Sequence, residues 1–183
     1  MILEIVQYGH PALRAKGRKI TKIDEELANL VDDMLETMVE ADGVGLAAQQ
    51  IGRPLQLCVI DVEGVTNRPS KMWVDGREVE LADYMPLALI NPEVELSGAP
   101  ETGTEGCLSF PGISADITRP ERVRVKTRLL DGSELTFEAE GLLARAVQHE
   151  FDHLQGTLFI DRMEPGDRKQ LEPKIARLQK NGG

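Results

Sequence analysis

The sequence predicts an α+β domain in which largely antiparallel sheets pack around one central helix, with a further helix at the C-terminus. Strand-like runs are grouped between the helices and joined as hairpins, whereas a parallel sheet would alternate strands with helices. The clearest hairpin connects residues 122–130 to residues 133–140 through Asp131-Gly132, a dipeptide typical of hairpin turns.

The first regular element is an amphipathic helix from Asp24 to Ala41. Asp24 suits the N-cap position, and Gly43 can end the helix. Apolar residues recur along it at helical spacing, namely Leu27, Leu30, Val31, Met34, Leu35 and Met38.

Two strands are expected on either side of a polar segment. The runs LQLCVIDV (55–62) and LALINPEVEL (87–96) are short and mostly apolar, which is typical of buried strands. Residues 63–85 between them are rich in turn formers, with Asp75-Gly76 as a candidate hairpin turn. The sequence does not show where this segment folds.

The last two elements are expected to be helices. The run GLLARAVQHEFDHLQG (141–156) carries one apolar stripe and ends at Gly156, a suitable C-cap. In the tail after Pro165, apolar residues again follow helical spacing, although Pro173 leaves the start of that helix undefined. The stripe of the first helix consists of Leu143, Val147, Phe151 and Leu154, and that of the tail of Leu171, Ile175 and Leu178.

The bulk properties predict a soluble, cytoplasmic enzyme or binding domain. A chain of 183 residues is long enough for one domain with a real core, and its net charge of −10 argues against a protein that coats nucleic acid. The N-terminus lacks the pattern of a secretory signal, and no run is long and apolar enough to span a membrane. Two cysteines, Cys58 and Cys107, are too few for a disulfide scaffold.

The stretch QHEFDH (148–153) is the strongest chemical signal in the chain. His149 and His153 are four residues apart on a predicted helix, so both imidazoles can face one point. Glu150 lies one step round the helix and can place a carboxylate beside that point without binding the metal. Two metal ligands and a general base are therefore predicted, and a third ligand has to come from elsewhere.

Several residues are candidates for that third ligand. A third histidine at the downstream position used in one class of zinc peptidase would be residue 159, which is Phe159. His10 beside Pro11 is expected at the surface, and Cys58 is expected to be buried as a small apolar residue. On spacing alone Cys107 and Glu172 compete closely, but a thiolate is the better donor for Zn²⁺ or Fe²⁺, which favours Cys107.

The stretch GVGLAAQQ (43–50) contains the glycine spacing of a dinucleotide-binding loop. That loop requires a strand before it and a helix after it, and here the order is reversed, so we discard this interpretation. What remains is a backbone segment poor in side chains, where a ligand backbone can approach closely, followed by the amide of Gln50.

Taken together and in this order, GVGLAAQQ, EGCLS (105–109) and QHEFDH resemble the three sequence motifs of the peptide deformylase family. All three match without departure, and the resemblance covers most of the chain. It implies a metal-dependent hydrolase that removes the N-terminal formyl group from formylmethionine of nascent polypeptides and releases formate. Residues 1–166 are then expected to form the catalytic domain, with residues 167–183 as a basic helical tail of the same domain.

The resemblance also implies roles for individual residues. Cys107, His149 and His153 would hold one divalent metal ion, with Fe²⁺ as the expected native ion and Zn²⁺, Ni²⁺ or Co²⁺ able to replace it. Glu150 would move protons during hydrolysis. The Gln50 side chain and the Leu108 backbone N–H would stabilise negative charge on the substrate oxygen, and Gly45 would let the substrate lie extended against the enzyme.

Two rival hypotheses stay open at this point, together with one prediction about partners. A thermolysin-like peptidase would use Glu172 as its third ligand, and a structural metal module would add Cys58 as a fourth. By resemblance, a basic tail predicts weak, salt-sensitive binding to the ribosome, without sequence-specific recognition of nucleic acid and without a membrane partner. The basic residues of the tail are Arg168, Lys169, Lys174, Arg177 and Lys180.

Overall fold

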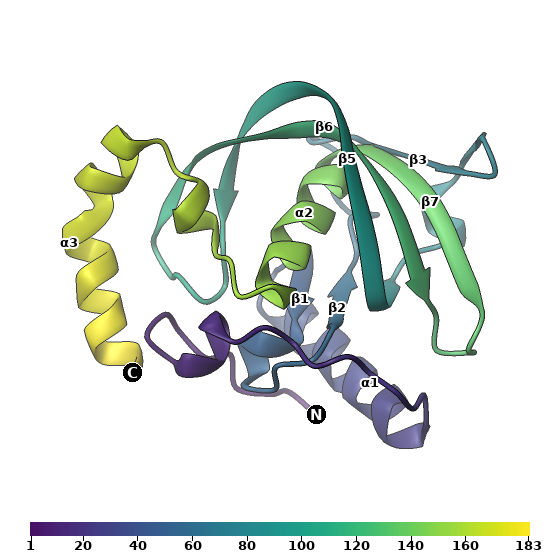
Figure 1. The fold of residues 1–183 in the computed structure, drawn as a ribbon, viewed down its shortest axis with the longest axis horizontal. Coiled ribbons are helices and arrows are strands. Elements are labelled where there is room, and N and C mark those ends of the chain that lie inside the picture. Colours follow the sequence, from purple (N-terminus) through teal and green to yellow (C-terminus); the bar gives the residue numbers. More distant parts are fainter.

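The computed structural model describes residues 1–183 and shows an α+β fold, as the sequence predicts. All strands join one antiparallel sheet in the order β1-β2-β5-β6-β7-β3-β4. The sheet curves around α2, which contacts β1, β2, β3, β5, β6 and β7 (Figure 1). In chain order the strands are β1 (Gly45–Ala47), β2 (Leu57–Ile60), β3 (Ser70–Val74), β4 (Arg77–Val79), β5 (Leu87–Gly106), β6 (Ser114–Arg128) and β7 (Glu134–Gly141).

The β5–β6 ribbon is longer than the sequence suggests. The predicted strands cover residues 87–96 and 122–130, but pairing continues from Pro100 opposite Pro120 to Gly106 opposite Ser114. Register shifts on either side of residues 93–97, with Gly98 at φ 85°, absorb the glycine and proline residues that looked like chain breaks. The extension was therefore missed because a bulge and a loop have similar local sequences.

Helix α1 (Glu25–Glu40) forms as predicted. The side chain of Asp24 accepts a hydrogen bond of 2.9 Å from the Leu27 N–H, which satisfies one of the free donors of the first turn. After the helix ends, the N–H of Gly43 donates to the Met38 carbonyl. The apolar face of α1 packs against β1 and β2, so the strand that carries Gly45 rests on a fixed support.

The segment 63–85 joins the sheet and also holds the start of α2 (Leu142–Leu154). Asp75 and Gly76 both have positive φ and form the expected turn between β3 and β4. Beside it, the N–H of Leu143 donates to Ser70 Oγ at 2.9 Å, which caps α2 from a distant part of the chain. Gly141 is required at this contact because a Cβ there would lie 2.1 Å from the Pro69 carbonyl oxygen.

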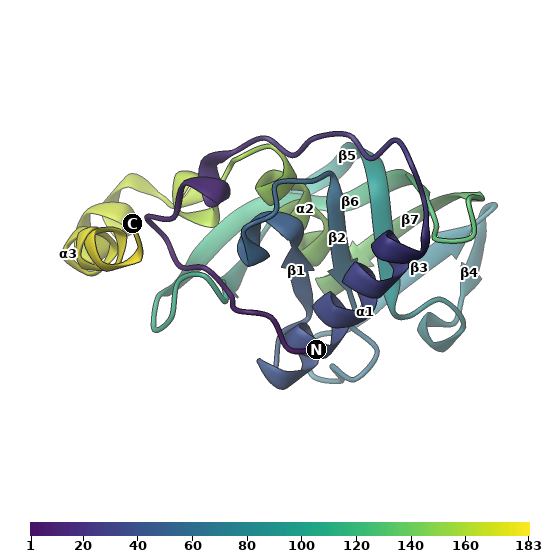
Figure 2. The same ribbon diagram turned by 90° about the horizontal axis from the view of Figure 1, so that it is seen from below.

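Helix α3 (Pro165–Gly182) lies at one end of the molecule beside the N-terminal segment (Figures 1 and 2). It starts at Pro165 and accommodates Pro173 in its interior, and its buried Ile175 joins a core cluster that includes Tyr8. None of the helices is both long and apolar enough to cross a membrane. Short 3-10 helices cover Pro11–Arg14, Ala48–Ile51, Leu81–Asp83 and Phe159–Arg162.

Candidate metal centre

Helix α2 presents His149 and His153 on one face, one turn apart, as the four-residue spacing requires. Their ring centroids are 5.1 Å apart, and the two residues are 7% and 1% exposed. Cys107 follows directly after β5, and its Sγ lies 3.4 Å from His153 Nε2. One donor atom from each of the three residues lies within 4.8 Å of the others. The structure thus brings these three predicted residues together.

The other candidates lie elsewhere. Glu172 is exposed on α3 and accepts a hydrogen bond of 3.0 Å from Arg168. Cys58 is buried within β2 and is not part of the three-residue group. His10 accepts a hydrogen bond from the Ala12 N–H through its Nδ1 atom. The thermolysin-like hypothesis requires Glu172 at the three-residue group, and the structural-module hypothesis requires Cys58 there. Neither residue belongs to that group.

Glu105, for which the sequence alone predicts no separate role, contacts His149, the first of the two histidine ligand candidates. Its Oε1 lies 2.9 Å from His149 Nδ1, so the Nε2 atom of that ring is left to face the cluster. Burial opposes ionisation of Glu105, but hydrogen bonds from His149 and Arg119 outweigh it and hold the pKa of this carboxyl well below its ordinary value. Glu105 is therefore an anion that fixes the orientation of His149.

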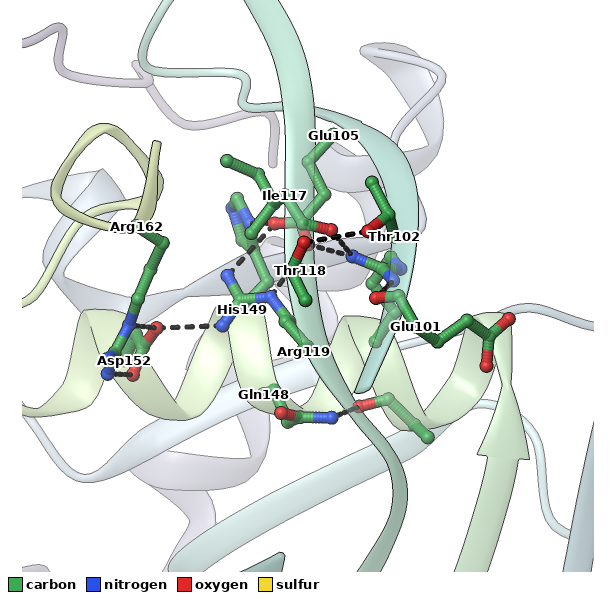
Figure 3. Close-up of polar contacts among 12 residues, drawn as sticks. Glu101, Thr102, Glu105, Ile117, Thr118, Arg119, Gln148, His149, Asp152 and Arg162 are labelled. Carbon is green, nitrogen blue, oxygen red and sulfur yellow. Dashed lines mark hydrogen bonds and ion pairs between the residues drawn. The ribbon is translucent and has the colours of Figure 1, made fainter. Parts of the chain in front are cut away.

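Arg119 connects this carboxylate to the outer side of α2 (Figure 3). Its guanidinium donates to Glu105 at 2.7 and 2.9 Å and to Asp152 at 3.0 Å. Arg145 donates a further bond of 2.8 Å to Glu105, and Arg162 pairs with Asp152. Glu105 lies within the motif EGCLS and Asp152 within QHEFDH, and this position is the only sequence signal for either residue. No sequence signal points to Arg119.

Glu150 is buried beside the cluster, with its carboxylate over the backbone of Gly45. A Cβ at residue 45 would lie 2.5 Å from Glu150 Oε2, so the glycine provides room for the protein's own carboxylate. Glu150 Oε1 has no hydrogen-bond partner in the protein. Burial raises the pKa of Glu150 to about 7. This carboxyl can therefore both accept and release a proton near neutral pH.

The amide of Gln50 is oriented by its neighbours. The N–H of Ala47 donates to Gln50 Oε1 at 2.9 Å, which fixes which end of the amide is the acceptor. The Nε2 end then faces Cys107 Sγ at 3.6 Å and Ser109 Oγ at 3.2 Å. Gln50 thus presents an N–H donor at the edge of the cluster.

A cavity of about 660 Å³ opens onto these groups. Its lining includes Gly43 and Gly45, at and just before β1, and Leu108 after Cys107. The polar side chains that line it are those of Gln50, Cys107, His149 and Glu150, among others. Strand β1 pairs only with β2, so its other edge is free to bind an extended chain. Apolar walls come from Phe110, Ile113, Leu142 and Ala146.

The donor set fits a divalent, borderline-soft metal ion. Two imidazoles and one thiolate are common ligands of such ions, and three protein ligands leave a position for water in a catalytic site. Burial lowers the pKa of His153 well below its ordinary value, which favours the neutral ring that a metal requires. The carboxylate of Glu105 contacts the other ring nitrogen of His149, as a carboxylate commonly does for a ligating histidine.

Comparison with known proteins gives a consistent result. The family model described as polypeptide deformylase matches residues 2–169. A peptide deformylase of Methylacidiphilum infernorum is 47% identical over 180 residues, which cover 98% of this chain and 94% of the relative. The crystal structure of peptide deformylase from Thermotoga maritima has a TM-score of 0.76 at 40% identity, covering 90% of this chain and 99% of that one. For a plant peptide deformylase 1B structure the TM-score is 0.83 at 37% identity, with 98% and 90% covered.

Proposed function

Because this chain belongs to the peptide deformylase family and is therefore a metal-dependent hydrolase that removes the formyl group from N-terminal formylmethionine, we propose that Cys107, His149 and His153 hold its metal ion. The observation that carries this assignment is the convergence of their three donor atoms within 4.8 Å, beside a cavity that Cys107 and His149 line. We further propose Fe²⁺ as the native ion, with Zn²⁺, Ni²⁺ or Co²⁺ able to occupy the same donor set.

A divalent ion held there would supply Lewis acidity, which makes water a nucleophile near neutral pH and polarises the formyl carbonyl. Glu150 accepts the proton of the attacking water and then delivers it to the departing amine as the formyl C–N bond breaks. The products are formate and a peptide with a free N-terminus. Glu150 is suited to this proton transfer because it is buried and its Oε1 atom has no hydrogen-bond partner in the protein.

Negative charge that develops on the formyl oxygen requires donors already in place. The Gln50 amide, held through its oxygen by Ala47, and the backbone N–H of Leu108 are assigned to this role. The substrate backbone lies extended along the free edge of β1 at Gly45. Both assignments are supported by the cavity lining, which includes Gly45, Gln50 and Leu108.

The test measures formate release from a formyl-Met peptide by protein purified without oxygen, together with its metal content. Glu150→Gln is expected to keep the metal and to lose about 10²- to 10⁴-fold in rate, the usual contribution of a general base. Cys107→Ala should lose the metal, while Cys58→Ser and Glu172→Ala serve as controls that should keep it. Full metal content in Cys107→Ala would refute the ligand assignment.

We also propose that residues 1–166 form the catalytic part of one cytoplasmic domain and that its basic tail, residues 167–183, binds the ribosome weakly. The tail helix buries Ile175 in the core, so deleting it would disturb folding. The better test replaces the exposed Lys169, Lys174 and Lys180 by alanine. Ribosome co-sedimentation at low salt should fall, and unchanged sedimentation would exclude the tail as a contact.

A further inference from the structure

A second cleft, of about 610 Å³, lies between the segment ahead of α1 and the paired strands β5 and β6. None of its lining residues is aromatic or a large aliphatic residue. The cleft shares no lining residue with the catalytic cavity. It is lined at the C-terminal end of α2 by Gln155, whereas the catalytic cavity follows α2 from Leu142 to Glu150. A ligand bound here would therefore leave the catalytic cavity open.

The walls of this cleft are fixed by buried and half-buried amides. Asn91, in the left-handed region at φ 51°, accepts a hydrogen bond from the Ile20 N–H and donates one to the Ile20 carbonyl, both at 2.8 Å. Gln56 donates to the carbonyl oxygens of Gly17 and Leu154 at 2.8 and 3.0 Å. These bonds hold the segment ahead of α1 against the sheet. The course of this segment toward α1 can be followed in Figure 2. The cationic residues of that segment are thus presented from a rigid frame.

Four cations line the cleft: Lys16, Lys19, Lys126 and Arg128. None of them takes part in an ion pair, in a protein of net charge −10. Arg128 donates one hydrogen bond of 3.1 Å to the Gly132 carbonyl oxygen, and the three lysines make no side-chain hydrogen bond. Two carboxylates also line it, Glu93 opposite Lys126 and Glu134 opposite Arg128 in the strand register. Cations therefore exceed carboxylates by four to two, and the excess lies on the side of Lys16 and Lys19.

We propose that this cleft binds the phosphate backbone of RNA, independently of base sequence. Lysine and arginine side chains on a polar frame are the usual partners of backbone phosphates. The cleft lacks an aromatic or apolar face on which a base could stack, which disfavours a nucleotide pocket. It also lacks the apolar centre of a stable protein interface. Since the substrate is a nascent chain, RNA is abundant where the enzyme works.

The test measures binding of a fluorescent single-stranded RNA 20-mer to the intact, metal-loaded enzyme between low and moderate salt. With up to four phosphate contacts, the slope of log K against log[salt] is expected at about −3, and Lys16→Ala/Lys126→Ala should reduce its magnitude by about 1.4. At 0.1 M salt this double variant should bind about tenfold more weakly or worse. Lys71→Ala/Arg77→Ala on the exposed β3–β4 hairpin removes the same charge and should bind like the wild type.

The proposal would be overturned if the wild type bound no RNA at low salt or if the cleft variant bound as well as the wild type. It would also be overturned if the hairpin variant lost as much affinity as the cleft variant. Competition separates the ligand sources: AMP should displace RNA no better than inorganic phosphate, and much stronger displacement by AMP would indicate a nucleotide pocket instead. Formate release from a soluble formyl-Met peptide should be unchanged in both variants, so loss of RNA binding is distinguished from failure of the catalytic assignment.

Discussion

Gly45→Ala places one extra carbon directly under the carboxylate that we assign as the general base. The new Cβ would lie 2.5 Å from Glu150 Oε2 and 2.9 Å from its Cδ. Ordinary contact begins at 3.4 Å, so the carboxylate has to retreat by about 0.9 Å, the difference between 3.4 and 2.5 Å. The clashing atoms belong to the end of a side chain, and Gly45 is not among the glycines with positive φ, so the backbone accepts alanine.

The magnitude follows from this displacement. A misplacement of about 1 Å at a reacting group costs on the order of 100-fold in rate, and we expect that loss in kcat. Glu150 is not one of the three assigned metal ligands, so metal content should remain that of the wild type. The stability of the fold should change little, because the strand itself gains a better strand former than glycine.

The assay is formate release from a formyl-Met peptide under anaerobic conditions, with metal content and Tm measured on the same samples. Gly64→Ala is the matched control, since nothing lies within 4 Å of the Cβ that it would add. If Gly45→Ala kept kcat within about twofold of the wild type with full metal content, Glu150 would not depend on its present position, and its assignment as a positioned base would be wrong.

Three further predictions concern residues outside the metal cluster. Glu105→Gln should weaken metal binding about 10- to 100-fold in equilibrium dialysis, because the anion that orients His149 is lost, and wild-type affinity would contradict this. Asp161 accepts bonds from Arg14 at 3.1 Å and from the Leu158 N–H; although burial opposes its ionisation, these bonds hold its pKa below the ordinary value of 3.8. The stability that ionised Asp161 contributes is present above pH 3.8 and is lost as the pH falls below that value. The free energy of unfolding in urea should therefore depend less on acid pH in Asp161→Asn than in the wild type. Equal pH dependence of the two proteins would refute this role of Asp161. Ser70→Ala removes the cap of α2 and should lower the free energy of unfolding by about 1 kcal/mol, with Ser133→Ala in an exposed turn as a comparison.

Several features could be predicted because neighbouring residues alone decide them. The four-residue spacing of His149 and His153 places both rings on one helix face in any fold that keeps the helix. The side chain of Asp24 caps α1, and Asp75-Gly76 turns the chain, through bonds and dihedral angles within a few residues. The family was identified from the order of three short motifs, and the comparisons confirm it.

Other features depended on which distant segments bury each other. The competition between Cys107 and Glu172 could not be settled by spacing, because the distance between residues far apart in the chain depends on how the sheet folds over α2. The partnership of Glu105 with Arg119 follows from the pairing of β5 with β6, and the cap that Ser70 gives to α2 follows from the position of β3 beside β7. Local sequence thus determined the two histidines and the carboxylate between them. Only tertiary packing, driven by the burial of apolar faces on a shared core, decided which thiol and which anion stand beside them.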